Sequence, residues 1–154
     1  MKSIYYYRTI IGKIGIGEDG HAITDVFFEG EDVKGEVRET PLIKEAYRQI
    51  KEYLEGRRKT FSIPISPKGT EFQQKVWNSL MNIPYGETKS YKDIALAVGN
   101  EKASRAVGMA NNRNPISIII PCHRVIGKNG KLVGYGGGLH IKEHLLKLEK
   151  ENSN

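Results

Sequence analysis

The stretch SYKDIALAVGNEKASRAVGMANN, residues 90–112, decides the fold of the second half of this chain. Ser90 and Asp93 match the capping box that starts a helix, and Gly99-Asn100 ends that helix. A further helix over about 102–112 follows at once. Two short helices joined by a glycine-containing turn predict a helix-turn-helix.

The residues on either side extend this pattern. Upstream, Thr70 and Gln73 form a second capping box and predict a helix before the pair. Downstream, the apolar run 116–120 predicts a buried strand. A turn at Asn129-Gly130 and a short strand at 132–133 would add a wing, and a last helix starts near Leu139.

The first 65 residues have a different pattern. Three segments rich in β-forming residues predict strands paired as hairpins: 4–7, 13–17 and 22–28. The acidic segment 29–39 is expected to be an exposed loop. Thr40-Pro41 predicts the start of an amphipathic helix that ends at Gly56, and the alternation over 61–65 predicts another short strand.

These elements predict an α+β chain of two domains. Residues 1–65 would form a small β-sheet and helix that support the second domain and pack on it. Residues 66–154 would form a winged helix-turn-helix domain, with Ser66-Pro67-Lys68-Gly69 as the linker.

The positive charge is confined to one of these halves. Residues 1–65 contain 11 Lys/Arg and 11 Asp/Glu, whereas residues 66–154 contain 13 and 7, a net charge of 13 − 7 = +6. A polyanion is therefore expected to bind the second half.

Several classes of protein and site are not expected. No apolar stretch has the length of a membrane span, and the first residues lack the apolar core of a signal peptide. The sole cysteine, Cys122, excludes an intramolecular disulfide and a zinc site of several cysteines, and it fits a reducing interior. His140 and His144 are four residues apart on a helix but have no evident third ligand, so no metal is expected. Residues 12–17 lack dinucleotide-binding spacing and are interpreted as a strand.

Cys122 is the candidate nucleophile. It lies in Pro121-Cys122-His123-Arg124-Val125, directly after the predicted strand, which would hold the thiol in a fixed place. Adjacent side chains on a strand point to opposite faces, so a bridging water would have to connect Cys122 to His123.

Four ordered blocks carry a resemblance to a known family: IPYGETKSY (83–91), SRAVG (104–108), RNP (113–115) and IIPCHRV (119–125). They closely resemble the O6-alkylguanine-DNA alkyltransferases, also called methylated-DNA–protein-cysteine methyltransferases, over about residues 66–150.

The resemblance implies a set of catalytic residues. Cys122 would accept the alkyl group, and His123 would take its proton through a water, with Glu149 orienting the imidazole. Tyr91 would help to rotate the nucleotide out of the duplex and protonate the leaving guanine. Asn114 would link the recognition helix to the active-site strand.

The resemblance also implies a DNA-binding surface and a base pocket. Small side chains make one side of the 102–112 helix flat, which suits either tight core packing or the minor groove. The resemblance favours the groove, with Arg105 filling the gap left by the extruded nucleotide. We predict further DNA contacts from Lys92, Asn100, Ser104 and Lys128, together with Tyr91. Val125, Tyr135 and Gly136 to Gly138 would form the base pocket.

We therefore predict a DNA repair protein that moves the alkyl group of O6-alkylguanine in double-stranded DNA irreversibly to Cys122, once per molecule. It would need no cofactor, bind no membrane and act as an intracellular, cytoplasmic monomer, associated with the nucleoid in a prokaryote. Two alternatives are a non-catalytic lesion sensor on the same fold and a cysteine hydrolase. Cys122 argues against the first alternative, and the basic helix-turn-helix half argues against the second.

Overall fold

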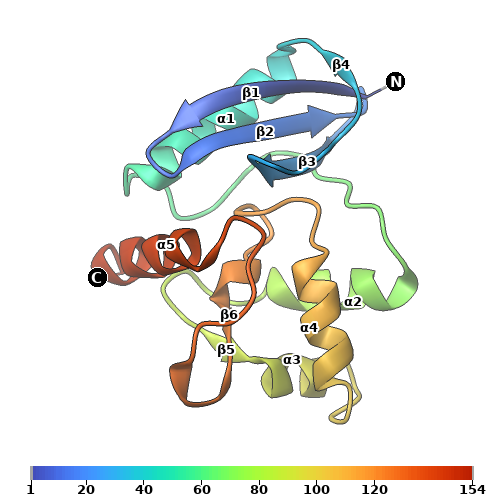
Figure 1. Cartoon of the computed structure of the whole chain (residues 1–154), viewed down its shortest axis with the longest axis vertical. Helices are drawn as coiled ribbons and strands as arrows, with labels where there is room; N and C mark the ends of the chain where they lie inside the picture. Colours follow the sequence, from blue (N-terminus) through green and yellow to red (C-terminus); the bar gives the residue numbers. More distant parts are fainter. Residues whose placement is uncertain (1, 154) are drawn as a thin grey trace. The chain divides into compact units, whose positions relative to one another are not determined.

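The computed structural model describes residues 2–153, and their contacts divide the chain into two compact units (Figure 1). The first unit contains the chain up to Lys68 together with residues 115–119. The second contains residues 69–114 and the chain from Ile120 onward. The first unit has the sheet and the second is mainly helical, so the predicted α+β class is confirmed.

The first unit is a four-stranded sheet in the order β3-β2-β1-β4. The strands β1 (Ser3–Thr9), β2 (Gly12–Glu18) and β3 (Ile23–Phe28) form an antiparallel meander, as predicted. The two-residue β4 (Glu36–Val37) pairs parallel to β1. The 29–39 segment, predicted to be entirely loop, therefore supplies an edge strand.

A glycine in the middle of β2 serves the packing of the sheet. Gly15 is paired with Tyr6 on one side and with Phe27 on the other. The Tyr6 and Phe27 rings meet edge to face at 5.8 Å, and a Cβ on Gly15 would lie 2.2 Å from the Phe27 ring. Only glycine leaves room for this aromatic pair.

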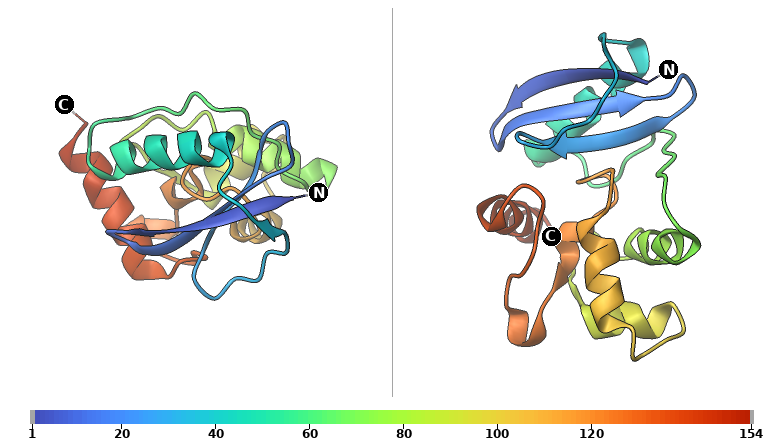
Figure 2. Two further views of the ribbon diagram at one scale, coloured as in Figure 1. Left: turned by 90° about the horizontal axis from the view of Figure 1, so that it is seen from above. Right: turned by 45° about the vertical axis from the view of Figure 1, so that its right-hand side comes forward.

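Helix α1 (Pro41–Leu54) packs on β1, β2 and β3. Both views in Figure 2 show it lying across one face of the sheet. It begins where predicted, since the Thr40 hydroxyl accepts a hydrogen bond from the Ile43 amide at 3.2 Å. Its fully buried side chains are Ile43, Ala46, Ile50 and Tyr53. These residues recur at helical spacing and form the core of the unit with the buried residues of β2 and β3.

The strand predicted over 61–65 is wrong. Only one bridge forms there, between Ile65 and Ile23. The Ile23 amide donates to the Pro64 carbonyl at 2.9 Å, and the Ser66 amide donates to the Ile23 carbonyl at 2.8 Å. Pro64 has no N–H of its own, so the ladder cannot continue through it.

The strand predicted over 116–120 is wrong as well. Ile116 makes a single parallel bridge to Val26 of β3, after which the chain turns. Ile118 has a φ of 74°, a left-handed conformation that disrupts a strand and is uncommon for a β-branched residue. Tight hydrogen bonds, from Ile119 N to Ser117 O at 2.8 Å and from Cys122 N to Ile120 O at 2.7 Å, complete the bend.

The second unit contains the predicted helix-turn-helix. Helix α2 (Glu71–Leu80) and helix α3 (Tyr91–Ala97) each start with the complete predicted capping box, from Thr70 with Gln73 and from Ser90 with Asp93. Helix α4 (Ser104–Asn112) follows a turn at Gly99 and contacts both α2 and α3 (Figure 1). Helix α5 (Leu139–Glu151) ends the unit. None of the helices within residues 2–153 is both long enough and apolar enough to span a membrane.

The predicted wing is replaced by a different arrangement. A two-residue strand β6 (Val125–Ile126) pairs parallel with β5 (Lys89–Ser90). The 3-10 turn η2 (Lys128–Gly130) follows, at the position of the predicted turn. Leu132 and Val133, predicted to form a strand, lie in an irregular segment whose carbonyls are bound by side chains.

Trp77 holds α2 against α4. Its side chain is 2% exposed, and its indole Nε1 donates to the Ala110 carbonyl of α4 at 2.9 Å. The Arg113 amide also donates to this carbonyl, at 3.2 Å, so the indole adds a second hydrogen bond that joins the two helices.

We predict that Trp77→Phe lowers the free energy of unfolding by about 1–3 kcal/mol, because it removes a buried hydrogen bond between the helices and part of a buried side chain. Urea denaturation followed by circular dichroism measures this change. Leu96→Ala, at a side chain that is 51% exposed on α3, is the control and should change stability little. Equal stability of Trp77→Phe and the parent would contradict the assigned role of the hydrogen bond.

Candidate functional site

Cys122 is the first residue of the 3-10 turn η1 (Cys122–Arg124) and is 4% exposed. The prediction that a strand delivers it is therefore wrong, and so is the strand-based argument about the directions of Cys122 and His123. A tight turn flanked by Pro115 and Pro121 fixes the thiol instead. Prolines restrict the backbone and supply no amide, which favours this bent path.

Two asparagines, one in the last turn of α4 and one just after the helix, donate hydrogen bonds to the backbone around Cys122. Asn114 Nδ2 donates to the Ile120 carbonyl at 2.9 Å, the kind of link predicted for this residue. Asn111 is 2% exposed, and its Nδ2 donates to the Cys122 carbonyl at 3.3 Å. The nucleophile and the second helix of the helix-turn-helix are therefore joined by side-chain hydrogen bonds.

Glu149 of α5 is the centre of a buried charge cluster. Its side chain is 1% exposed. Oε2 lies 2.7 Å from His123 Nε2 and 3.0 Å from an Arg124 terminal nitrogen. Oε1 accepts from Arg124 Nε at 2.8 Å and from the Gly86 amide at 3.1 Å. The other Arg124 terminal nitrogen donates to the Ile83 carbonyl at 2.7 Å.

These contacts determine the charge of each member. Burial by itself would raise the pKa of Glu149, but the hydrogen bonds and charges of His123 and Arg124 outweigh it and lower that pKa to about 2. Burial lowers the pKa of His123, and the nearby cations Arg124 and Lys142 lower it further against the opposing effect of Glu149. Near neutral pH the pair therefore consists of a carboxylate and a neutral imidazole.

This charge state fixes the histidine tautomer. An ionised carboxylate only accepts hydrogen bonds, so His123 Nε2 must carry the hydrogen that points at Glu149. His123 Nδ1 then has the lone pair and is the basic atom of the ring. The cluster can therefore accept one proton, with the resulting imidazolium stabilised by Glu149.

Two groups from other helices lie in the electrostatic field of Cys122. The Tyr91 hydroxyl, at the start of α3, donates to the Val133 carbonyl at 3.3 Å. Burial raises the pKa of Tyr91, and Cys122 adds to this, so Tyr91 stays a protonated donor. Lys142 of α5 is 0% exposed, and burial lowers its pKa to about 8 against the opposing effect of Cys122.

The predicted base-pocket residues belong to two neighbouring segments. Val125 is fully buried in β6. Tyr135 is half-buried in the irregular segment, which continues through Gly136 and Gly137 to Gly138, the residue that caps α5. Lys142 Nζ connects the segments, since it donates to the Val125 carbonyl at 2.6 Å and to the Val133 carbonyl at 2.8 Å.

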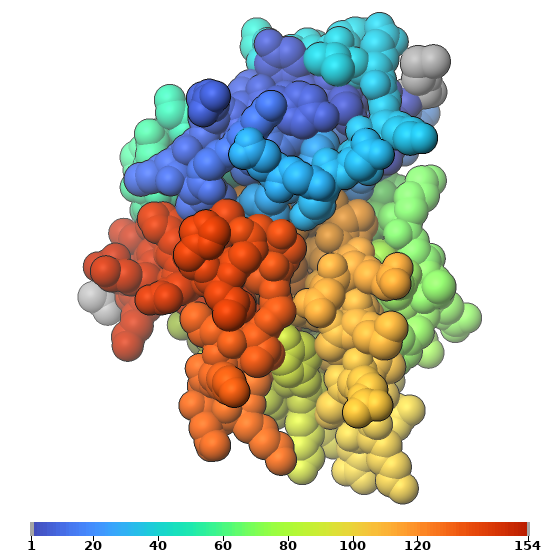
Figure 3. Space-filling model, viewed as in Figure 1, coloured from blue at the N-terminus to red at the C-terminus, as the bar shows by residue number. Residues whose placement is uncertain are grey.

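The predicted DNA-contacting residues lie mostly on the surface of the second unit. Lys92, Asn100, Arg105 and Lys128 are exposed, whereas Tyr91 and Ser104 are half-buried. They come from α3, the following turn, α4 and η2. In the space-filling view, the turn before α4 (yellow) and η2 (orange) are both open to solvent (Figure 3).

The small residues of α4 do not all lie on one flat face. Ala110 is buried and Ala106 is exposed, and a Cβ on Gly108 would lie 3.7 Å from the Tyr91 ring. Met109 is 57% exposed. Some of the small residues therefore serve core packing, and others lie on the open surface, where DNA contact stays a prediction.

Three residues of the site were not identified from the sequence: Arg124, Lys142 and Asn111. Arg124 could have been suspected, because an arginine next to a Cys-His pair resembles a charge partner. Lys142 and Asn111 gave no signal, because a lysine on an amphipathic helix and an asparagine near a helix end are ordinarily exposed.

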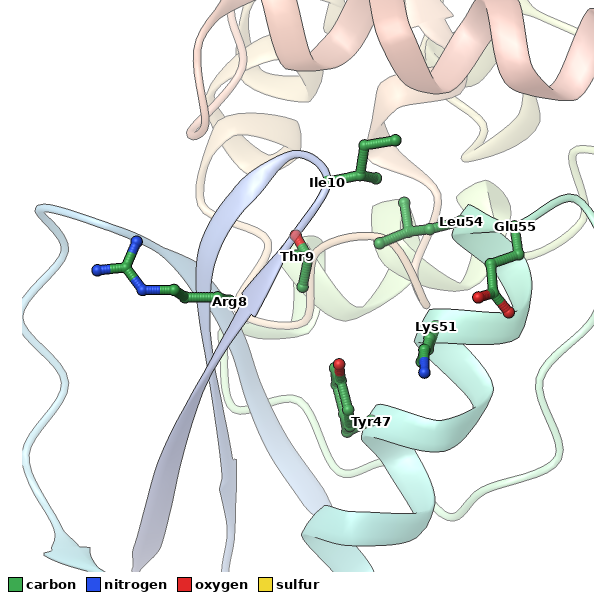
Figure 4. Close-up of a pocket in the computed structure, with 7 residues that line it drawn as sticks. All are labelled: Arg8, Thr9, Ile10, Tyr47, Lys51, Leu54 and Glu55. Carbon is green, nitrogen blue, oxygen red and sulfur yellow. The ribbon is translucent and has the colours of Figure 1, made fainter.

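Other parts of the described chain hold fewer groups that could react or bind a metal. Within residues 2–153, no group of three or more His, Cys, Asp or Glu side chains is placed to hold a metal. A pocket of about 360 Å³ lies in the first unit, between the β1–β2 turn and the end of α1 (Figure 4). Its seven lining residues include no cysteine or histidine, and Arg8 points away from the others. The reactive groups are therefore those around Cys122.

Glu149→Gln should destabilise the protein by about 3–5 kcal/mol at pH 7, because it leaves the buried Arg124 charge without its partner. The pKa of Glu149 in the folded protein lies below the unfolded value of 4.5, so its ionisation stabilises the fold above pH 4.5. That stabilisation is lost as the pH falls toward 2. The difference in the free energy of unfolding between the parent and Glu149→Gln should therefore shrink over this range.

Urea denaturation at pH 7 and pH 3 measures both effects. Glu45→Gln is the matched control, since the pKa of Glu45 is also lowered to about 2 but this residue is on the surface. We expect little change for the control. If Glu149→Gln lowers the free energy of unfolding as much at pH 3 as at pH 7, the ionised state of Glu149 is contradicted.

Comparisons with known proteins identify the family. Residues 4–67 match the model described as "6-O-methylguanine DNA methyltransferase, ribonuclease-like domain". Residues 71–151 match the model described as "6-O-methylguanine DNA methyltransferase, DNA binding domain".

Two relatives and two solved structures are similar over nearly the whole chain. The methylated-DNA–protein-cysteine methyltransferase of Methanosarcina acetivorans is 52% identical, covering 95% of this chain and 98% of its own. The constitutive enzyme of that name from Bacillus subtilis is 51% identical, covering 94% and 95%.

The crystal structure of the Mycobacterium tuberculosis O6-methylguanine methyltransferase has a TM-score of 0.92 at 39% identity and covers 100% of this chain and 96% of its own. The structure of Mycobacterium tuberculosis OGT in complex with DNA has a TM-score of 0.91 at 41% identity, covering 97% and 94%. The family inferred from the sequence blocks around Cys122 is thus shown independently: this chain belongs to the 6-O-methylguanine DNA methyltransferases.

Proposed function

We propose that this chain repairs DNA by transferring the alkyl group of O6-alkylguanine to Cys122, once per molecule. The observation that carries the proposal is the buried cluster of His123, Arg124 and Glu149 next to Cys122. It supplies a nucleophile that can be deprotonated and a base of fixed tautomer in one rigid place. In this proposal residues 66–154 carry out the chemistry and residues 1–65 support it.

The transfer is balanced without a cofactor. The Cys122 thiol loses its proton to His123 through a bridging water, and Glu149 stabilises the imidazolium. The thiolate sulfur attacks the alkyl carbon, an S–C bond forms, the C–O6 bond breaks and its electron pair remains on the guanine. The guanine gains one proton, so that thiol and alkylguanine become thioether and guanine. A thioether is not readily cleaved, so the protein reacts once.

Tyr91 is proposed as the group that protonates the leaving base. Its raised pKa keeps it a phenol, and its hydroxyl already donates to a neutral carbonyl next to the proposed pocket. A flipped base with a more basic nitrogen would compete for that hydrogen. Val125, Tyr135 and Gly136 to Gly138 would form the walls around the base, and Asn114 would hold the segment that leads to Cys122.

The proposed substrate is alkylated double-stranded DNA. The net charge of +6 over residues 66–154 and the exposed Lys92, Asn100, Arg105 and Lys128 favour a phosphate backbone. Arg105 on α4 would occupy the space left by the flipped nucleotide, with Ser104 beside it. A cysteine that forms no disulfide also fits the reducing interior of a cell, where we expect the protein to act as a monomer.

The intact-protein mass after mixing with duplex DNA containing one O6-methylguanine tests the reaction. We expect a gain of one methylene unit on Cys122 that stops at one equivalent. Cys122→Ala is the control and should bind the lesion without gaining mass. Binding by the parent without a gain in mass would instead identify a sensor of the lesion, and neither binding nor transfer would leave a cysteine hydrolase.

Arg105→Ala should slow the repair of duplex DNA by about tenfold or more, since unpairing a base costs a few kcal/mol and Arg105 would offset part of that cost. Its reaction with free O6-benzylguanine should be unchanged, because a free base needs no extrusion. Single-turnover rates with both substrates measure the difference. Arg113→Ala, at another exposed arginine, is the control, and equal losses on both substrates would refute the role in extrusion.

A further inference from the structure

Met109 is a large apolar side chain on the open side of α4. It is 57% exposed, whereas Val107 and Ala110 of the same helix are buried. The exposed residues of α4 recur at the spacing of one helical face: Arg105, Ala106, Met109 and Asn112. Met109 therefore lies one helical turn from Arg105, on the same side of the helix.

The position of Met109 in the site is more informative than its exposure, since single exposed apolar side chains are common. The residue before it, Gly108, lies against Tyr91, because a Cβ on Gly108 would be 3.7 Å from the Tyr91 ring. The buried Asn111 donates through Nδ2 to the Cys122 carbonyl. The backbone that carries Met109 is thus held in place by contacts with two residues of the candidate site.

Phosphate binding does not account for an apolar residue on this face. Phosphates are bound by charged and polar groups, which residues 66–154 supply with their net charge of +6. Apolar side chains, methionine among them, contact DNA where they enter the minor groove and press between adjacent base pairs. The unbranched side chain of methionine adapts to an irregular gap, and its sulfur makes favourable contacts with aromatic rings. The chemistry of Met109 therefore fits a step between two base pairs.

Helical spacing relates this base step to the flipped nucleotide. Residues four apart in a helix are separated by about 6 Å along its axis, and stacked bases are separated by about 3.4 Å. If Arg105 fills the space that the nucleotide leaves, Met109 reaches a base step at most about two steps away. Partial unstacking at that step would lower the cost of turning the nucleotide out of the duplex.

We propose that Met109 is an apolar wedge: it presses on a base step beside the alkylated nucleotide in the minor groove of duplex DNA and assists the extrusion of that nucleotide toward Cys122. This inference rests on the proposed function, because it requires DNA to bind α4 and the nucleotide to leave the duplex. An apolar contact releases no counterions, so the wedge raises affinity without adding to the salt dependence of binding.

The test is binding to an O6-methylguanine duplex, and to its single strand, in a Cys122→Ala background that cannot react. Met109→Ala and Met109→Gln should weaken duplex binding by about fivefold to tenfold, and Met109→Leu should keep the parent's affinity. The slope of log K against log salt concentration should stay the same in all three, whereas Lys92→Ala should reduce it by about one. Met81→Gln, at a methionine that is 46% exposed just after α2, is the matched control and should bind like the parent.

Unstacking has its own signal, the fluorescence of 2-aminopurine placed beside the O6-methylguanine. It should rise when the parent in the Cys122→Ala background binds, and rise less with Met109→Ala. Unchanged duplex affinity and fluorescence in Met109→Ala would overturn the wedge, as would equal losses on duplex and single strand, because a wedge acts only on stacked pairs. A parent that binds the duplex but transfers no methyl group would refute the proposed reaction and leave the wedge standing, whereas a parent that does not bind DNA would refute both.

Discussion

The second unit is organised around one ionised carboxylate, that of Glu149, which has almost no contact with water. A charge in such a place is tolerated only when hydrogen bonds and an opposite charge replace the lost hydration. His123 and Arg124 of η1 and the Gly86 amide supply these contacts, so that with Glu149 three separate parts of the chain meet. The carboxylate can therefore be satisfied only when α5, η1 and the turn before β5 are all correctly placed.

The contacts that stabilise Glu149 also affect the protonation state of His123. Burial is the main reason that the pKa of His123 is lowered, and the charge of Arg124 adds to this by opposing the effect of Glu149, so that neutral His123 presents Nδ1 as a base. A histidine paired with Glu149 alone would be drawn toward the protonated state, as the opposing effect of Glu149 on its pKa indicates. The arginine therefore does more than stabilise the fold, because it leaves the imidazole free to accept the proton of Cys122 in the proposed reaction.

The sequence predicted what depends on local rules and missed what depends on distant partners. Helices α1, α2 and α3 begin directly after their N-caps Thr40, Thr70 and Ser90, because these caps are made within one helical turn. The apolar run 116–120 met every local criterion for a strand, yet the left-handed Ile118 and the flanking prolines bend it. Lys142 looked like any lysine of an amphipathic helix, because its burial is decided by carbonyls far away in the chain.

The bent segment before Cys122 has its backbone partners in the first unit. By its contacts 115–119 belongs to the first unit, where the Val26 amide binds the Pro115 carbonyl and the Ser117 amide binds the Val26 carbonyl. The residues on either side of this segment belong to the second unit, and the hydrogen bond from Asn114 Nδ2 to the Ile120 carbonyl joins them.

A left-handed Ile118 costs free energy, of order 1–3 kcal/mol, which the burial of the surrounding isoleucines must offset. The edge of β3 provides the partner that Ile116 needs for this burial. The sheet of the first unit thus provides the backbone partners of Pro115 and Ser117 at the start of this bend.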